Sequence, residues 1–165
     1  MSTDFYLKME PVKGESKAKG HEGEIDILSF SFGATQPSLS FSGGGAGAGK
    51  VDVHDASFSH YVDLASAYLM SGCCKGTHFK KATLTCRKAG DDPLEFLIYT
   101  LEDVIITGVN TNGQSGGADH PSETFTLNFQ KFTKKYTPQG DTGGSGEGGN
   151  PEFTYHIAKR EASSV

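Results

Sequence analysis

Hydrophobic and polar residues alternate along most of this chain. The alternation is clear near the start, in the second half and near the end, in residues 5–9, 125–129 and 153–157. A period of two is typical of β-strands that bury one face. The segment FLIYTLEDVIITGV, residues 96–109, is apolar on both parities, which predicts a strand covered on both faces at the centre of a sheet.

Two segments shift the phase of this alternation. In EIDILSFSF, residues 24–32, the apolar set moves from odd positions to the even positions Leu28, Phe30 and Phe32, and residues 51–58 show a similar shift. Such a shift requires a bulge or a second buried surface. We expect Leu28, Phe30 and Phe32 to face the interior, and we interpret apolar residues on both faces as contacts between subunits.

One segment predicts a helix. Asp63–Lys75, DLASAYLMSGCCK, carries a loose apolar stripe, with Asp63 placed to cap its start and Gly76 placed to end it. Many strands, glycine-rich connections and one helix predict a mainly β fold, a compact antiparallel β-barrel of two sheets with one short α-helix. We expect a single domain over residues 1–165, with a mobile glycine-rich loop at residues 140–150.

The stretch SGGGAGAGKV, residues 42–51, has the spacing of a phosphate-binding loop. Gly44, Gly49 and Lys50 match G-x-x-x-x-G-K, but Val51 stands where a hydroxyl group should reach magnesium. The flanking segments read as strands, whereas a phosphate-binding loop precedes a helix. A connection between strands is therefore favoured over a nucleotide site.

Charge and hydropathy exclude other classes of function. The chain of 165 residues has 15 Lys and Arg against 20 Asp and Glu, a net charge of −5, so we expect no nucleic-acid partner. No apolar run approaches the roughly 20 residues needed to cross a bilayer, so we expect no membrane insertion. MSTDFYLKME does not resemble a secretory signal, which predicts synthesis in the cytoplasm and export, if any, by a route without a cleaved signal.

No catalytic or metal motif is evident. Cys73, Cys74 and Cys86 are expected to be reduced structural thiols, with redox or metal roles as the alternative. On an extended strand His54 and His60 would lie about 20 Å apart, too far for one metal. We therefore expect no enzyme, no cofactor and no metal, although catalytic groups assembled across a fold are invisible in one sequence.

Six segments spread along the chain carry a shared signature: VKGES at 12–16, EIDILSFSFG at 24–33, GGGAGAGKV at 43–51, FSHYVD at 58–63, RKAG at 87–90 and ETFTLNF at 123–129. Taken together, these segments resemble the Hcp family, the haemolysin-coregulated tube proteins of the bacterial type VI secretion system. Phe30 and Phe32 depart from the pattern, because family members often carry tryptophan there.

The resemblance implies a hexameric ring with a central channel. Rings of this family stack into a hollow tube inside a contractile sheath, tipped by a spike protein, and the tube is secreted into a target cell. Small effector proteins ride in the channel. If the even positions of LSFSF face the barrel interior, Ser29 and Ser31 point the other way, and in such a ring they would face the channel and contact effectors.

The glycine-rich loop at residues 43–50 resembles an element that projects from the ring and takes part in stacking. Glycines allow close approach of the backbone to another ring. Lys50 could meet an acidic rim formed by Asp91 and Asp92 of the next ring. The loop residues concerned are Gly43, Gly44, Gly45, Gly47, Gly49 and Lys50.

Three alternatives stay open at this point, and one of them is an enzyme that uses the histidines at positions 54 and 60. A phage-type tail tube protein would share the fold and the ring. A carbohydrate-binding β-sandwich would need exposed aromatic residues for sugar stacking, but the chain has no Trp and its aromatic residues mostly follow the buried parity.

Overall fold

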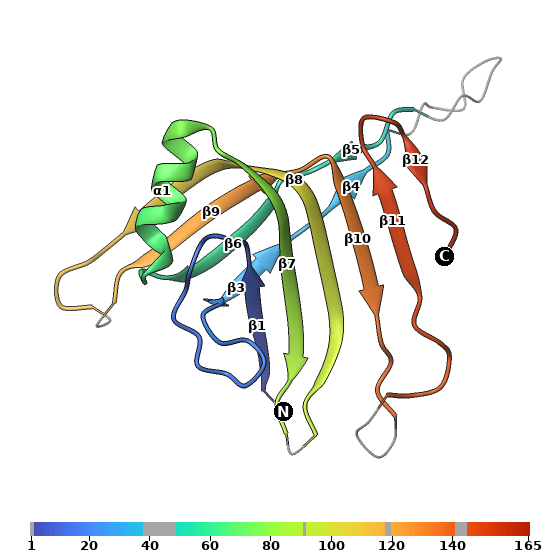
Figure 1. Cartoon of the computed structure of the whole chain (residues 1–165), viewed down its shortest axis with the longest axis horizontal. Helices are drawn as coiled ribbons and strands as arrows, with labels where there is room; N and C mark the ends of the chain where they lie inside the picture. The colour runs from blue at the N-terminus through green and yellow to red at the C-terminus, as the bar shows by residue number, and fades with distance from the viewer. Residues whose placement is uncertain (1, 38–48, 91, 118–119, 141–144) are drawn as a thin grey trace.

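The protein folds around one large antiparallel sheet (Figure 1). The computed structural model describes residues 2–37, 49–90, 92–117, 120–140 and 145–165. Ten strands form the large sheet, and β4 and β5 form a separate pair. The elements are β1 (Thr3–Lys8), β2 (Ile25–Ile27), β3 (Ser29–Ser31), β4 (Ala34–Thr35), β5 (Asp52–Val53), β6 (Ala56–Tyr61), α1 (Ala65–Lys75), β7 (His78–Lys88), β8 (Leu94–Asn112), β9 (Ser122–Asn128), β10 (Lys131–Tyr136), β11 (Glu152–His156) and β12 (Glu161–Ala162).

Strand β8 is the centre of the sheet, as its apolar sequence predicts. Its first part pairs with β7 and β10, and its last part pairs with β9. Asp103, at the change of partner, has a positive φ of 53°, an uncommon conformation for a residue other than glycine. Beyond this point the sheet continues through β9 and β6 to β3 and curls back over itself (Figure 1).

The predicted mainly β fold with two antiparallel sheets and a helix is confirmed, but the barrel is not closed. β2 pairs with β1, whereas β3 pairs with β6. Leu28 alone separates β2 from β3, so the chain changes partner there, and the backbone N–H of Leu28 donates to Ser59 O at 2.8 Å. The curled sheet encloses the core without closing into a complete barrel.

The phase shift in EIDILSFSF marks this change of partner. Ile25 and Ile27 of β2 are buried in the core. The chain then bends at Leu28, which is 48% exposed. The expectation that Leu28 faces the interior is therefore wrong, because the strand changes partner there. Phe30 and Phe32 do pack against the core, as expected.

Helix α1 begins two residues later than predicted. The carboxylate of Asp63 accepts a hydrogen bond from the backbone N–H of Ala65 at 2.8 Å, and Gly76 ends the helix in the left-handed conformation, with φ of 62°. The side facing the sheet carries Ala65, Leu69 and Gly72. The predicted apolar stripe is thus only partly correct, because three of its members are exposed: Leu64, Tyr68 and Met70.

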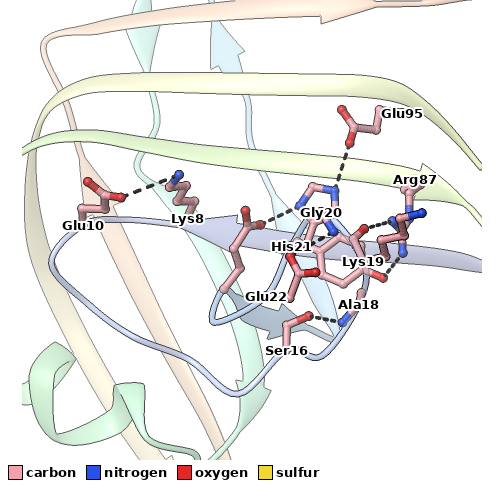
Figure 2. Close-up of polar contacts among 12 residues, drawn as sticks. Lys8, Glu10, Ser16, Ala18, Lys19, Gly20, His21, Glu22, Arg87 and Glu95 are labelled. Atoms are coloured by element: carbon pink, nitrogen blue, oxygen red, sulfur yellow. Dashed lines mark hydrogen bonds and ion pairs between the residues drawn. The ribbon is translucent and has the colours of Figure 1, made fainter.

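Residues 9–24, the strap, connect β1 to β2 and lie across the outer side of the sheet (Figure 2). His21 stacks on the ring of Tyr6, with centroids 4.4 Å apart, and its two ring nitrogens lie 2.8 Å from Glu24 Oε2 and 3.0 Å from Glu95 Oε1. The strap therefore explains why Tyr6 is buried on the side of β1 that the alternation assigns to solvent. Gly14 is required by packing, since a Cβ there would lie 2.3 Å from the backbone oxygen of Glu24.

Candidate functional site

Small hydroxyl side chains form two rows across β3, β6 and β9. Ser29, Ser59 and Thr124 lie opposite one another in register, and so do Ser31, Ser57 and Thr126. Ser29, Ser31 and Thr124 are exposed, and the other three are half-buried. We call these six residues the hydroxyl face.

The period of two along each strand creates this face. Phe58 on β6 and Phe125 on β9 lie at the alternate positions, where they are 3% and 1% exposed and stack with ring centroids 5.2 Å apart. Neighbouring residues on a strand point to opposite sides. Burial of the phenylalanines in the core therefore directs the hydroxyl groups outward.

Hydrogen bonds hold the hydroxyl face in a fixed geometry. The Oγ atoms of Ser29 and Ser59 lie 2.5 Å apart, and Thr107 Oγ1 lies 2.8 Å from Thr126 Oγ1. Asp55 lies beside Thr107 with both carboxylate oxygens occupied, because Thr107 Oγ1 donates at 2.7 Å and Asn128 Nδ2 donates at 2.8 Å. The six side chains of the hydroxyl face are small and neutral, and Asp55 places one exposed carboxylate at its edge.

Sequence reasoning found Ser29 and Ser31 but missed the other four members of the hydroxyl face. Their signal was present, because Ser57 and Ser59 alternate with Phe58, and Thr124 and Thr126 alternate with Phe125. The pairing of β3 with β6 and of β6 with β9 could not be read from one strand at a time. Only the register brings these residues together.

The glycine-rich loop leads from a strand into a strand. Gly43, Gly44, Gly45 and Gly47 lie outside the described residues. Lys50 is exposed and is followed by β5, so the helix that a phosphate-binding loop needs does not follow. Gly49 is held against the preceding chain: its carbonyl accepts a hydrogen bond from Gln36 Nε2 at 2.6 Å, and a Cβ at Gly49 would lie 2.6 Å from Pro37 Cγ.

The residues proposed as the opposing rim lie in another part of the subunit. Asp92 is exposed in the connection between β7 and β8, and Asp91 lies outside the described residues. Figure 1 shows this connection far from β4 and β5, the strands that flank the glycine-rich loop. Lys50 and Asp92 are therefore not brought together within one chain.

The histidines considered for catalysis are also kept apart. His54 is exposed and lies 3.3 Å from the hydroxyl group of Thr35, whereas His60 is fully buried. Among the residues that the structure describes, no group of three or more His, Cys, Asp or Glu side chains is arranged to hold a metal ion. The described helix is too short and too polar to span a membrane.

Comparison with known proteins gives consistent similarities over nearly the whole chain. The family described as "Type VI secretion system effector, Hcp" matches residues 6–136. Protein hcp1 of Pseudomonas aeruginosa is 44% identical over 158 residues, which cover 95% of this chain and 96% of the relative.

Solved structures agree with the sequence comparison. A type six secretion system protein has a TM-score of 0.92 at 26% identity and covers 98% of this chain and 100% of that protein. Hcp1 from Salmonella typhimurium has a TM-score of 0.81 at 32% identity and covers 99% of this chain and 100% of that protein. The fold of the curled sheet and its helix is therefore shared with these proteins.

Proposed function

Because this chain belongs to the Hcp family of type VI secretion system tube and effector proteins, we propose that its hydroxyl face lines the channel of a hexameric ring. The observation that carries the proposal is the pair of in-register rows of small, neutral hydroxyl groups on the outer side of β3, β6 and β9. Small side chains leave the channel wide, and hydroxyl groups keep its wall hydrated. Such a wall suits varied protein cargo that is held weakly.

The two layers of the subunit support this orientation. The core lies between the β3–β6–β9 layer and the layer that contains β1, β7 and β10. If the first layer faces the channel, the strap and the lysines of the second layer face the outside of the tube. We propose that the sheath surrounds this outer side and that the spike protein closes the end of the stack.

Stacking of the rings is the second part of the proposal. We infer that residues 43–50 project from one ring and that Lys50 meets Asp91 and Asp92 of the next. Support comes from the exposure of Lys50 and Asp92 and from their separation within one chain (Figure 1). In this proposal residues 1–165 act as one tube domain that is made in the cytoplasm, leaves the cell through the type VI system and catalyses no reaction.

Ser31→Gln tests the channel proposal. A longer side chain in every subunit should narrow the channel. Retention of small effector proteins should fall roughly tenfold, which corresponds to a loss of about 1.4 kcal/mol in the free energy of binding. Retention is measured by co-purification of co-expressed effectors from the bacterium that encodes this chain. Ring formation is measured by native mass and negative-stain electron microscopy. Ser164→Gln, at an exposed position outside the hydroxyl face, is the matched control.

Two outcomes would contradict the proposal separately. Intact rings of Ser31→Gln that retain effectors as well as the unaltered protein would refute the role of the hydroxyl face. A monomer at high concentration of the unaltered protein would refute the ring itself.

A further inference from the structure

Two titratable side chains are buried beneath the hydroxyl face, and an exposed threonine continues their row. His60 on β6, Glu123 on β9 and Thr111 on β8 are direct cross-strand partners. His60 is 0% exposed and Glu123 is 2% exposed, although both are titratable. A buried charge is costly unless a partner compensates it, so the contacts of this row decide its role.

The row forms a continuous chain of contacts. Thr111 Oγ1 donates to Glu123 Oε2 at 2.7 Å, and Glu123 Oε1 lies 3.1 Å from His60 Nε2. On the other side of the ring, His60 Nδ1 lies 3.6 Å from Asp63 Oδ1, an ion-pair distance longer than a normal hydrogen bond. The edge of the imidazole ring meets Phe125, with centroids 5.3 Å apart.

Asp63 connects this chain to the start of α1. The same Oδ1 atom accepts the backbone N–H of Ala65 at 2.8 Å, and the backbone N–H of Asp63 donates to Ser66 Oγ at 3.0 Å. The imidazole of His60 therefore lies between a carboxylate from the sheet and a carboxylate that orders the first turn of the helix. Only a ring protonated on both nitrogens can present a positively charged N–H to each of them.

We propose that His60, Glu123 and Asp63 form a proton-dependent clasp that holds the start of α1 and the base of the β8–β9 hairpin to the sheet. While His60 carries its proton, the cation compensates both carboxylates. When the proton is lost, one ring nitrogen becomes a lone pair facing a carboxylate. The start of α1 and the hairpin then open locally more often.

The electrostatics of the site give the direction of the pH dependence. Burial lowers the pKa of His60, but the interactions with the Asp63 carboxylate and then with the Glu123 carboxylate outweigh burial and raise the pKa above its ordinary value. Among the residues that the structure describes, Asp63 and Glu123 are the charged groups that act on His60, and β8 contributes the neutral Thr111 to the row.

The sign of the pH dependence follows from the linkage between proton binding and folding. A raised pKa in the folded state means that the stabilisation is fully present below the unfolded value of about 6.5, and is lost as the pH rises through the folded value. The clasp therefore holds at mildly acidic pH and releases in alkaline solution.

The clasp also fixes the register of the surface above it. Ser59 and Thr124 are the chain neighbours of His60 and Glu123, so the buried pair and the surface pair are opposite sides of the same two strands. A slip of one residue would exchange them. This consequence for the channel wall rests on the proposed function, whereas the clasp itself does not.

Hydrogen exchange measured by mass spectrometry tests the clasp on the full chain. After correction for the intrinsic rate, peptides covering residues 61–70 and 111–123 should exchange about tenfold faster at pH 9 than at pH 6.5, while a peptide covering residues 97–101 should not change. His60→Gln should exchange fast in these peptides at both pH values. His78→Gln, which removes an exposed histidine, should behave like the unaltered protein.

Equal protection of these peptides at both pH values in the unaltered protein would overturn the proposal. If His60→Gln does not fold, NMR titration of the His60 ring in the unaltered protein decides, because a ring that is neutral at pH 6.5 would also overturn it. Ring assembly is measured on the same samples by native mass. Failure of the clasp with intact rings is thus distinct from failure of the proposed function.

Discussion

Burial separates the three cysteines in reactivity. Cys86 is 0% exposed between β1 and β8, and burial raises the pKa of its thiol to about 12. Cys74 is exposed on α1, and Cys73 is half-buried. The thiolate is the reactive form, so a thiol held neutral in the core is inert. This burial agrees with the alternation in ATLTCRK, where Cys86 is in phase with Ala82 and Leu84.

We expect a thiol reagent such as Ellman's reagent at pH 8 to modify Cys74 rapidly, Cys73 more slowly and Cys86 only after unfolding. The absorbance of the released chromophore gives the number of modified thiols, and it is measured before and after addition of guanidinium. Cys74→Ser should remove the fast phase alone. Fast modification of Cys86 in the folded protein would contradict its place in the core.

At the scale of elements, packing decides what local sequence leaves open. The hydroxyl and aromatic residues of β6 and β9 alternate regularly, so each strand reveals its two faces. The sequence of α1 does not reveal its buried side, because apolar residues lie on all sides of the helix. Only contact with the sheet selects the side that is buried. Glu123 was missed, although it stands in phase with Phe125 and Leu127, the pattern of a buried position.

Leu69→Ala should lower the free energy of unfolding by about 2–5 kcal/mol. Leu69 is fully buried on the side of α1 that faces the sheet, and truncation of its side chain leaves a cavity. Leu64→Ala is the matched control, since Leu64 is 55% exposed at the start of the same helix. Chemical denaturation measures both. Similar losses for the two variants would show that α1 packs on the sheet in another orientation.

At the scale of the whole molecule, the proposed assembly uses surfaces that lie far apart in one subunit. The proposed stacking contact joins Lys50 of one ring to Asp92 of the next, and both residues are exposed. An interaction between opposite charges can be tested by reversing each charge singly and then both together.

Lys50→Glu and Asp92→Lys should each shorten or abolish tubes without breaking rings, because each places like charges at the ring contact. The double variant should restore tubes. Electron microscopy measures tube length, native mass measures rings, and Lys159→Glu, at an exposed position on the β11–β12 connection, is the control. Equal tube lengths in all variants would remove this pair from the stacking contact.

The sequence alone determined the strand-rich character of the protein, the central place of β8, the limits of α1 to within two residues and the outward direction of Ser29 and Ser31. These properties depend on neighbours along the chain, through the period of a strand and the capping of a helix. Tertiary structure alone decided the change of strand partner at Leu28, the rows of the hydroxyl face and the burial of His60 beside Glu123. Those features depend on which strands pair and in which register, and pairing is set by the packing of residues that are far apart in sequence.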